Sequence, residues 1–322
     1  MPLTPLDDIY RERRFPWPAA VLGVLVLAAV LWFFLRPGRE KADGAAAAAT
    51  NEVAAAAGSA PAAAQPAAPA RPVVPGDLTD EDFRKALADA KALDDQGKLY
   101  DEREVLLAAL AKAGSDFAPA LERTLGALST RIYLEPRPGP DKVEYVVKGG
   151  DALSAIASRF VCPKELIMEA NGIKDPTKIR PGQRLVFPDH PAFAVRVSKS
   201  LNTLELTLGG KFFKKYVVGT GQNAKTPAGT FVVKDKIEHP DWWSESGKVI
   251  PYGDPANVLG THWLALEATG ETPRVSGYGI HGTWDNTTLG KQSSAGCVRM
   301  SNADVRELFL FLPRQTPVVI VE

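Results

Sequence analysis

The sequence is poor in cysteine and histidine. Only Cys162 and Cys297 among 322 residues are cysteine, which excludes both a disulfide scaffold and a four-cysteine zinc site. The four histidines form no His-x-x-x-His pair. Because a metal site needs three or four convergent ligands, we expect no metal site, and we expect no cofactor.

Charge is balanced over the whole chain. Lys plus Arg number 38 and Asp plus Glu number 38, so the formal net charge is zero. Without an overall field to gather a polyanion, we expect no nucleic-acid partner. The hydrophobic share of 45% is ordinary for a globular protein. At about 150 residues per domain, the length predicts about two compact domains.

One long apolar stretch lies near the start of the chain. Residues 19–35 carry no charge over 17 positions, and residues 15–18 extend them to about the 20 needed to cross a bilayer. Charged residues follow directly in place of a cleavage site, so we expect an uncleaved transmembrane anchor after a cytoplasmic tail, residues 1–18. Cleavage within the alanine run 45–49 is the alternative. Three basic residues on each side leave the orientation open.

Residues 36–76 are dominated by alanine and proline and lack the large side chains that build a core. We interpret them as a linker. At about 3.1 Å per residue in extended proline-rich backbone, roughly 35 residues reach on the order of 100 Å. Such a tether would let the following domains search a layer outside the bilayer.

Residues 77–134 show helical spacing. Apolar residues recur at Phe83, Leu87, Ala90 and Leu93, and two further helices are indicated up to residue 133. The first two resemble one tetratricopeptide-type hairpin without a second copy. The segment is therefore either a small α-helical spacer or a docking module for a protein partner, and prolines from 136 to 140 mark a domain boundary.

The pattern of residues 143–188 predicts a strand, two short helices and a second strand, in that order. Over its whole length this βααβ stretch resembles the LysM module, on Gly150-Asp151-x-Leu153, Asn171-Gly172 and the turn through residues 179–183. The resemblance implies a shallow groove for N-acetylglucosamine-containing glycans. The residues lining it would be Gly150, Asp151, Ala152, Leu153, Ile179, Arg180 and Pro181. Turn formation alone is the other interpretation of these residues. We expect Cys162 to be a buried, inert thiol unpaired with Cys297.

Residues 192–322 carry mainly strand patterns, with a hairpin turn at Gly209-Gly210 and a closing strand over 317–321. The sequence therefore predicts a mainly-β domain, mixed or barrel-like. Near its end, His281 precedes Cys297 by 16 residues, and small residues surround both. A thiol acts as a nucleophile when a neighbouring imidazole takes its proton and lowers its pKa. Backbone N–H groups at Gly296 and Cys297 are suited to stabilise an oxyanion.

His281-Gly282-Thr283 and Ser294-x-Gly296-Cys297-Val-Arg299-Met resemble the catalytic motif of the L,D-transpeptidase (YkuD) family. Residues 226–231, 259–266 and 316–318 match it further. The resemblance implies that Cys297 attacks a stem-peptide carbonyl and expels D-alanine, with His281 as base oriented by a carbonyl near Gly282. Substrate contacts would come from Arg299, Ser294, Thr283, Tyr278 and Trp243. Many members have histidine where this chain has Ala295, so backbone donors must suffice for the oxyanion.

Several of these residues have other interpretations. Arg299 is alternatively an ion-pair partner, and Ser294 alternatively holds the loop. Trp242-Trp243 either covers the site as a lid or packs in an ordinary loop. His262 lies in an apolar strand pattern, so we expect it to be packed. His190 and His239 stand next to prolines and are typical of loops.

These features together predict a membrane-anchored enzyme that cross-links peptidoglycan, its LysM module holding glycan while Cys297 transfers stem peptides. Such a protein would span the bacterial cytoplasmic membrane once, with residues 36–322 facing the periplasm or cell wall. Two alternatives stay open. Water as acceptor would make the chain an L,D-carboxypeptidase, and loss of activity would leave a non-catalytic peptidoglycan-binding scaffold.

Overall fold

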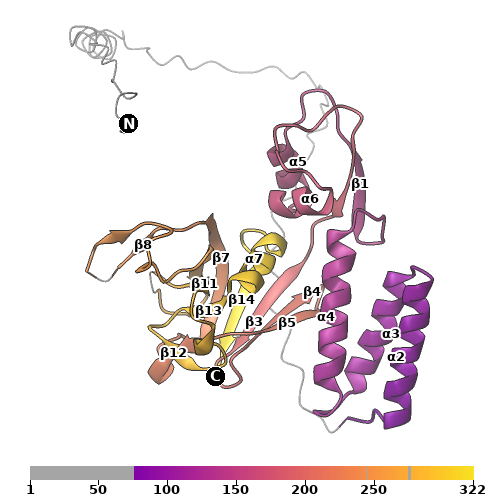
Figure 1. Ribbon diagram of the computed structural model, residues 1–322, viewed down its shortest axis with the longest axis horizontal. Helices are drawn as coiled ribbons and strands as arrows, with labels where there is room; N and C mark the ends of the chain where they lie inside the picture. Colours follow the sequence, from indigo (N-terminus) through magenta and orange to yellow (C-terminus); the bar gives the residue numbers. More distant parts are fainter. Residues whose placement is uncertain (1–75, 245, 275–276) are drawn as a thin grey trace, which may run out of the picture. The chain divides into compact units, whose positions relative to one another are not determined.

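The computed structural model describes residues 76–244, 246–274 and 277–322 (Figure 1). The predicted cytoplasmic tail, the transmembrane anchor at 19–35 and the linker up to residue 75 lie outside these residues. Among the residues described, no helix is both long and apolar enough to cross a membrane.

The helical segment consists of three helices, as the apolar spacing predicts. They are α2 (Asp80–Asp95), α3 (Leu99–Lys112) and α4 (Ala118–Leu134). Thr79 caps α2 because its hydroxyl accepts the N–H of Asp82 at 3.1 Å. The chain turns sharply after α2 at Gly97, whose φ of 71° is open to glycine without strain. The three helices pack together through buried leucines such as Leu106, Leu121 and Leu125.

The predicted strand-helix-helix-strand order is confirmed for the next module. Its elements are β1 (Lys142–Val146), α5 (Leu153–Arg159), α6 (Lys164–Ala170) and β2 (Arg184–Pro188). The two strands are antiparallel, and Val146 pairs with Arg184. The loops that follow β1 and precede β2 therefore meet at one edge. Asn171 joins α6 to β2, since its amide donates to the carbonyls of Ile167 and Val186 and accepts the N–H of Val186.

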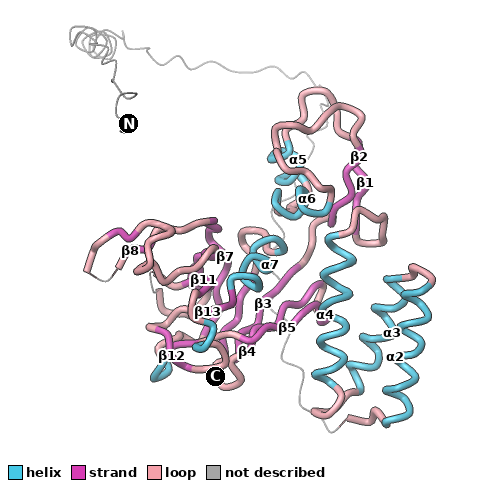
Figure 2. Tube along the Cα trace, in the orientation of Figure 1, coloured by secondary structure: helices cyan, strands magenta, loops and turns pink. Residues whose placement is uncertain are grey.

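Most of the strands of the described residues after the second module form one mixed sheet, drawn in magenta in Figure 2. This sheet has eight strands in the order β13-β11-β10-β7-β14-β3-β4-β5. Its strands are β3 (Phe193–Ser198), β4 (Thr203–Leu208), β5 (Lys211–Val217), β7 (Gly229–Glu238), β10 (His262–Thr269), β11 (Gly279–Thr283), β13 (Val298–Ser301) and β14 (Pro317–Val321). Two short pairs flank it: β6 (Thr220–Gly221) with β12 (Gln292–Ser294), and β8 (Trp242–Trp243) with β9 (Val249–Ile250). The predicted hairpin turn at Gly209-Gly210 joins β4 to β5.

A helix that the sequence pattern did not indicate, α7 (Asn302–Phe311), packs on β10 and β11. Ser301 caps it by accepting the N–H of Asp304 at 3.0 Å. The buried side chains of α7 include Val305, Leu308 and Phe311. This helix covers one face of the sheet at the end where His281 and Cys297 lie.

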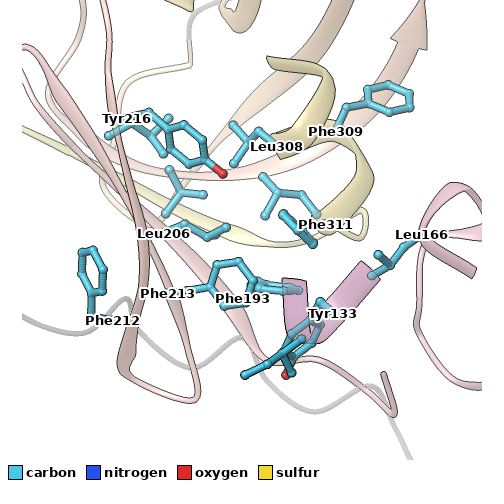
Figure 3. Packing of buried hydrophobic residues seen from close by; sticks show 14 of the residues in the cluster. Tyr133, Leu166, Phe193, Leu206, Phe212, Phe213, Tyr216, Leu308, Phe309 and Phe311 are labelled. Atoms are coloured by element: carbon cyan, nitrogen blue, oxygen red, sulfur yellow. The ribbon is translucent and has the colours of Figure 1, made fainter. Parts of the chain in front are cut away.

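The helical segment shares its core with the sheet. Tyr133 from α4 contacts the rings of Phe193, Phe213 and Phe311 at centroid distances of 5.2 to 6.4 Å (Figure 3). The pairs with Phe213 and Phe311 are edge-to-face, and such pairs add about 0.5–1.5 kcal/mol each beyond the area they bury. The segment is therefore a packed part of the fold, which is a closer association than a spacer implies.

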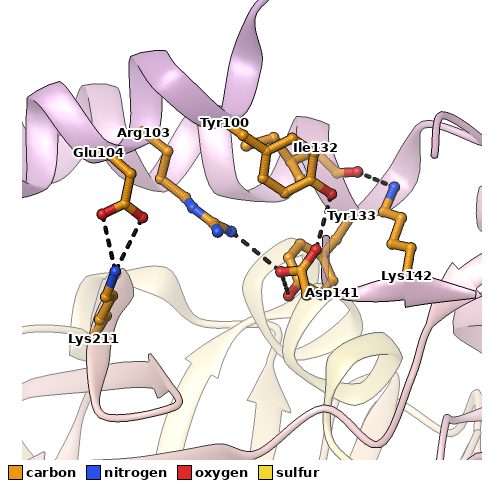
Figure 4. A network of polar contacts seen from close by, with 8 residues as sticks. All are labelled: Tyr100, Arg103, Glu104, Ile132, Tyr133, Asp141, Lys142 and Lys211. Atoms are coloured by element: carbon orange, nitrogen blue, oxygen red, sulfur yellow. Dashed lines mark hydrogen bonds and ion pairs between the residues drawn. The ribbon is translucent and has the colours of Figure 1, made fainter. Parts of the chain in front are cut away.

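Polar contacts fix the junction between the helical segment and β1 (Figure 4). Asp141 accepts hydrogen bonds from the hydroxyls of Tyr100 and Tyr133, and Arg103 pairs with it at 3.4 Å. Lys142 donates to the carbonyls of Ile132 and Glu135 at the end of α4. An ammonium at a helix C-terminus satisfies carbonyls that have no partner within the helix. The proline-rich boundary is thus held rigidly on its C-terminal side.

Candidate active site

Strand register places the candidate catalytic residues on one face of the sheet. β11 and β13 are parallel, with His281 opposite Arg299 and Ile280 opposite Val298. Side chains alternate between faces, so His281, Arg299 and Cys297 lie on the face away from α7. Cys297 precedes its own strand by one residue and stands beside Gly279. Two residues along a strand and one strand across place the Cα atoms of Cys297 and His281 about 8 Å apart.

The loop that presents Cys297 is held by buried hydrogen bonds. The Ser294 hydroxyl donates to the Cys297 carbonyl at 2.7 Å and accepts the Gly296 N–H at 3.1 Å. From the opposite side, the buried Thr226 hydroxyl donates to the Gly296 carbonyl at 2.6 Å and accepts the Gly221 N–H at 2.7 Å. Ser294 therefore holds the loop in this structure, the structural alternative of the sequence analysis. The clamp by Thr226 was not foreseen.

The Cys297 thiol is a protonated group in a partly buried position. Its Sγ donates to the Gly277 carbonyl at 3.6 Å. The Gly279 N–H and the charge of Arg299 lower the pKa of Cys297, but burial outweighs both and raises that pKa above its ordinary value. The sequence predicts instead that a neighbouring imidazole lowers this pKa. In the structure burial dominates, and among the residues described no hydrogen bond joins His281 to Sγ.

His281 is fixed in orientation and tautomer. Its Nδ1 lies 2.6 Å from the Gly282 carbonyl oxygen, which only accepts, so Nδ1 carries the proton and Nε2 keeps the lone pair. The ring stacks on Trp263, its cross-strand partner, with centroids 5.7 Å apart and planes inclined by 25°. Burial lowers the pKa of His281 to about 4, although the carbonyls of Gly282 and Leu259 act in the opposite direction. The imidazole is thus a neutral base at pH 7.

Arg299 offers an unused donor. Its guanidinium donates to the Ser293 hydroxyl at 2.7 Å, while its Nε is buried and has no hydrogen-bond partner within the described residues. Burial lowers the pKa of Arg299, against the effects of Asp285 and Cys297. A buried donor without an acceptor is unfavourable by about 1–3 kcal/mol, so a substrate oxygen at Nε would be stabilised.

The other predicted substrate contacts occupy different positions. The Tyr278 ring lies against Gly296, and its hydroxyl donates to the Lys225 carbonyl at 2.9 Å. Thr283 is buried and accepts the Asp285 N–H. Trp243 is 73% exposed on the β8–β9 hairpin, and no contact between Trp243 and Cys297 is seen in the described part of the chain. Of these three, only Tyr278 lines the Cys297 loop.

The β8–β9 hairpin is tied to the site through Asn257, which sequence reasoning did not single out. Asn257 is 1% exposed, and its amide donates to the carbonyls of Pro240 and Ile250. Its own carbonyl accepts the indole N–H of Trp284 at 3.1 Å. Trp284 directly follows His281-Gly282-Thr283 in the sequence, so the hairpin is linked to the end of β11. An asparagine between two apolar residues gave no signal beyond turn formation.

The predicted glycan residues lie in two adjacent loops of the second module. Gly150, Ala152, Arg180 and Pro181 are exposed there, and Ile179 is half-buried. The Asp151 carboxylate accepts the Lys148 N–H and the Tyr145 hydroxyl, both at 2.8 Å. Leu153 is 1% exposed within the core, so its side chain does not line a surface groove. The exposed residues remain candidates for glycan contact.

The two cysteines and the other histidines have distinct surroundings. Both thiols are free, and burial raises the pKa of Cys162 far above its ordinary range. His262 is buried against Phe309 with ring centroids 4.8 Å apart, as its apolar context predicts. His190 and His239 are exposed. Cys162 is thus an inert thiol in the LysM-like module.

Comparison with known proteins agrees with this geometry. The family model of the L,D-transpeptidase catalytic domain, YkuD, matches residues 192–320, and the LysM domain model matches residues 145–188. "Putative L,D-transpeptidase YkuD" of Bacillus subtilis is 32% identical over 182 residues, which are 55% of this chain and 97% of that protein. "Putative L,D-transpeptidase YqjB" of the same species is 39% identical over 129 residues, 40% of this chain and 70% of that protein.

A longer match extends the similarity. "Probable L,D-transpeptidase YcfS" of Escherichia coli is 29% identical over 231 residues, 64% of this chain and 71% of that protein. The parallel strands that carry His281 and lead from Cys297, beside the smaller βααβ module, thus agree with an L,D-transpeptidase catalytic domain joined to a LysM domain. The chain belongs to the L,D-transpeptidase (YkuD) family.

Proposed function

We propose that the protein is a membrane-anchored peptidoglycan L,D-transpeptidase that works through a Cys297 acyl-enzyme. The observation that carries the proposal is the placement of Cys297 and a neutral, carbonyl-oriented His281 on the same face of adjacent parallel strands. A neutral imidazole with a free Nε2 lone pair is suited to accept the thiol proton.

In the first half-reaction, Nε2 of His281 takes the proton of Cys297 as Sγ attacks the carbonyl of the third stem-peptide residue. The electron pair of the C=O bond moves to oxygen and gives a tetrahedral oxyanion. The N–H of Cys297 is a donor for that oxygen, whereas the Gly296 N–H is already used by Ser294. The oxyanion then collapses, the C–N bond breaks, and protonated His281 gives its proton to the departing amine of D-alanine.

In the second half-reaction, an acceptor amine attacks the Cys297 thioester. His281 removes a proton from the amine, a new amide bond forms, and the thiolate leaves and is reprotonated. The free Nε of Arg299 is placed to hold a substrate oxygen during both steps. Thr226 and Ser294 keep the nucleophile fixed by holding the backbone on each side of it.

The segments before the catalytic domain determine where the enzyme acts in the proposed function. We propose that residues 19–35 cross the bacterial cytoplasmic membrane once and that residues 36–322 face the periplasm or cell wall. The LysM domain would hold glycan through the exposed loop residues Gly150, Ala152, Arg180 and Pro181. Joining two weak sites on one chain raises the local substrate concentration. A protein partner for residues 77–134 would have α2 and α3 available, because α4 packs on β5.

Intact-mass spectrometry of the full-length protein in detergent tests the chemistry. A carbapenem should add once, on Cys297, and a tetrapeptide stem with an amine acceptor should lose D-alanine and yield a cross-linked product. Cys297→Ala should lose both reactions, and Cys162→Ala, the matched control, should keep both. D-alanine loss without a cross-link would instead define an L,D-carboxypeptidase. Absence of adduct and turnover in a folded sample that binds peptidoglycan would define a scaffold.

A further inference from the structure

A cavity of about 480 Å³ lies between the LysM domain and the catalytic domain, on the α7 side of the sheet. One wall is α5 with the loop to α6, and the other is formed by β7, α7 and residues 313–314. The cavity is within the range of small-molecule sites, about 300–1,000 Å³. His281 and Cys297 face the other side of the sheet, so this cavity is separate from the candidate active site.

Lys236 on β7 supplies a buried cation to this cavity. Its side chain is 6% exposed, and its nearest carboxylate, Glu165, is 4.0 Å away. Its ammonium also lies over the ring of Phe309, with Nζ 4.3 Å from the ring centroid. Burial lowers the pKa of Lys236 to about 8. An ammonium so placed is stabilised by an anion that enters the cavity.

The other charged groups at the cavity leave one positive charge uncompensated. Arg314 is held by Asp235 through two hydrogen bonds of 3.1 and 2.7 Å. Glu165 is shared between Lys164, at 3.8 Å, and Lys236. One carboxylate facing two ammonium groups leaves a net charge of one. A singly charged anion such as a carboxylate matches that charge, whereas a doubly charged phosphate exceeds it.

Part of the lining is apolar. It includes Ala157, Pro163, Phe309 and Pro313. These residues offer van der Waals contact to an apolar group of a ligand. Ser154, also in the lining, follows the predicted glycan loop directly in the sequence. A peptide that branches from a glycan in that loop would therefore start beside the mouth of the cavity.

We propose that this cavity binds the terminal carboxylate of a short peptide carried by the glycan strand that the LysM domain holds. Lys236 forms the ion pair with the carboxylate. The bound peptide does not react, because Cys297 lies on the opposite face of the sheet. The proposal rests on the proposed function for the identity of the polymer. In it, the LysM domain binds the glycan, and Lys236 on β7 binds the stem peptide attached to that glycan.

Trace acetylation with acetic anhydride tests the site in the full-length Cys297→Ala protein, which binds without turnover. A stem tetrapeptide with a free C-terminal carboxylate should slow acetylation of Lys236 about tenfold at saturation, because an ion pair keeps the amine protonated. Lys234, exposed two residues earlier and paired with Glu267 at 2.9 Å, is the internal reference and should not change. The same peptide as a C-terminal amide should leave both lysines unaffected.

Calorimetry adds a second measurement. Lys236→Met should weaken binding of the free-acid peptide to the Cys297→Ala protein about tenfold, and Lys234→Met should not.

Equal protection of Lys236 from acetylation by the free-acid peptide and by the amide peptide overturns the proposal. Protection by inorganic phosphate but not by the peptide also overturns it. The acetylation experiment needs no Lys236 variant, so misfolding of Lys236→Met leaves the test intact. If the parent enzyme cross-links stem peptides but the peptide does not protect Lys236 from acetylation, the inference about this cavity is overturned and the proposed function stands. Lys236 protection without Cys297 chemistry supports the site and overturns the proposed activity.

Discussion

The two faces of β10, β11 and β13 differ in almost every physical respect. On the face toward α7, Leu264, Ile280 and Val298 are at most 1% exposed and belong to the continuous hydrophobic core. On the other face lie His281, Arg299 and the Cys297 loop, with burial that shifts all three pKa values. Neighbouring residues of one strand therefore lie on different faces: the core face toward α7, and the chemical face with His281, Arg299 and the Cys297 loop. Substitutions on the core face should change the free energy of unfolding, and substitutions on the chemical face should change the rate of acylation.

The largest expected effect is on the chemical face. Cys297→Ala removes the proposed nucleophile, so carbapenem acylation and D-alanine release should fall by on the order of 10⁴-fold or more. The thermal midpoint should change little, because Cys297 contributes little to the core. Intact-mass kinetics and thermal melts measure the two quantities. A Cys297→Ala protein that melts far below the parent would contradict the separation of the faces.

The next effect is on the core face. Ile280→Ala leaves a cavity beneath α7, so the free energy of unfolding should fall by about 2–5 kcal/mol, against about 0.5–1.5 kcal/mol for the control Ile280→Val. Urea denaturation measures this loss. Below the transition, the rate of Cys297 acylation should stay within a few-fold of the parent. A collapse of acylation in folded Ile280→Ala would show that the two faces are coupled.

Local patterns predicted much of this arrangement. The βααβ order and the Gly209-Gly210 hairpin depend on residues close together in the sequence. Periodicity and turn chemistry report such neighbours well. The carbonyl that orients His281 was implied by the family resemblance. The assignment of Cys297 and His281 to catalysis came from a motif.

What the sequence did not reveal depends on distant contacts. In the sequence, Tyr133 is indistinguishable from the other apolar positions of a helix. Its contacts with Phe213 and Phe311 form only in the folded chain. Thr226 reaches Gly296 across 70 positions, although its own segment, residues 226–231, had been noted only as a match to the family. The raised pKa of Cys297 follows from burial that no local spacing encodes. The short apolar run of α7 is ambiguous between helix and strand.

Thr226 offers a further test of the difference between the two faces, because its hydroxyl contacts the loop before Cys297 only through backbone atoms. Thr226→Val keeps the shape but leaves the Gly296 carbonyl and the Gly221 N–H without their partner. We expect acylation of Cys297 to slow by about 10- to 100-fold, the range for a misplacement near 1 Å. Thr230→Val, exposed in the same motif, is the control and should match the parent in acylation assays. Equal rates for both variants would rule out a positioning role.

The smallest expected effect is a shift in pH dependence from Arg299→Met. The charge of Arg299 lowers the pKa of Cys297 and also that of His281, so removing it should raise both. Iodoacetamide alkylation of Cys297, which follows the thiolate, should then move its midpoint to higher pH. The acidic limb of acylation, which requires neutral His281, should move upward as well. Arg299→Lys keeps the charge and should leave both limbs near those of the parent. If the two limbs moved in opposite directions, one shared cation could not account for them, and the electrostatic link between Arg299 and this face of the sheet would be wrong.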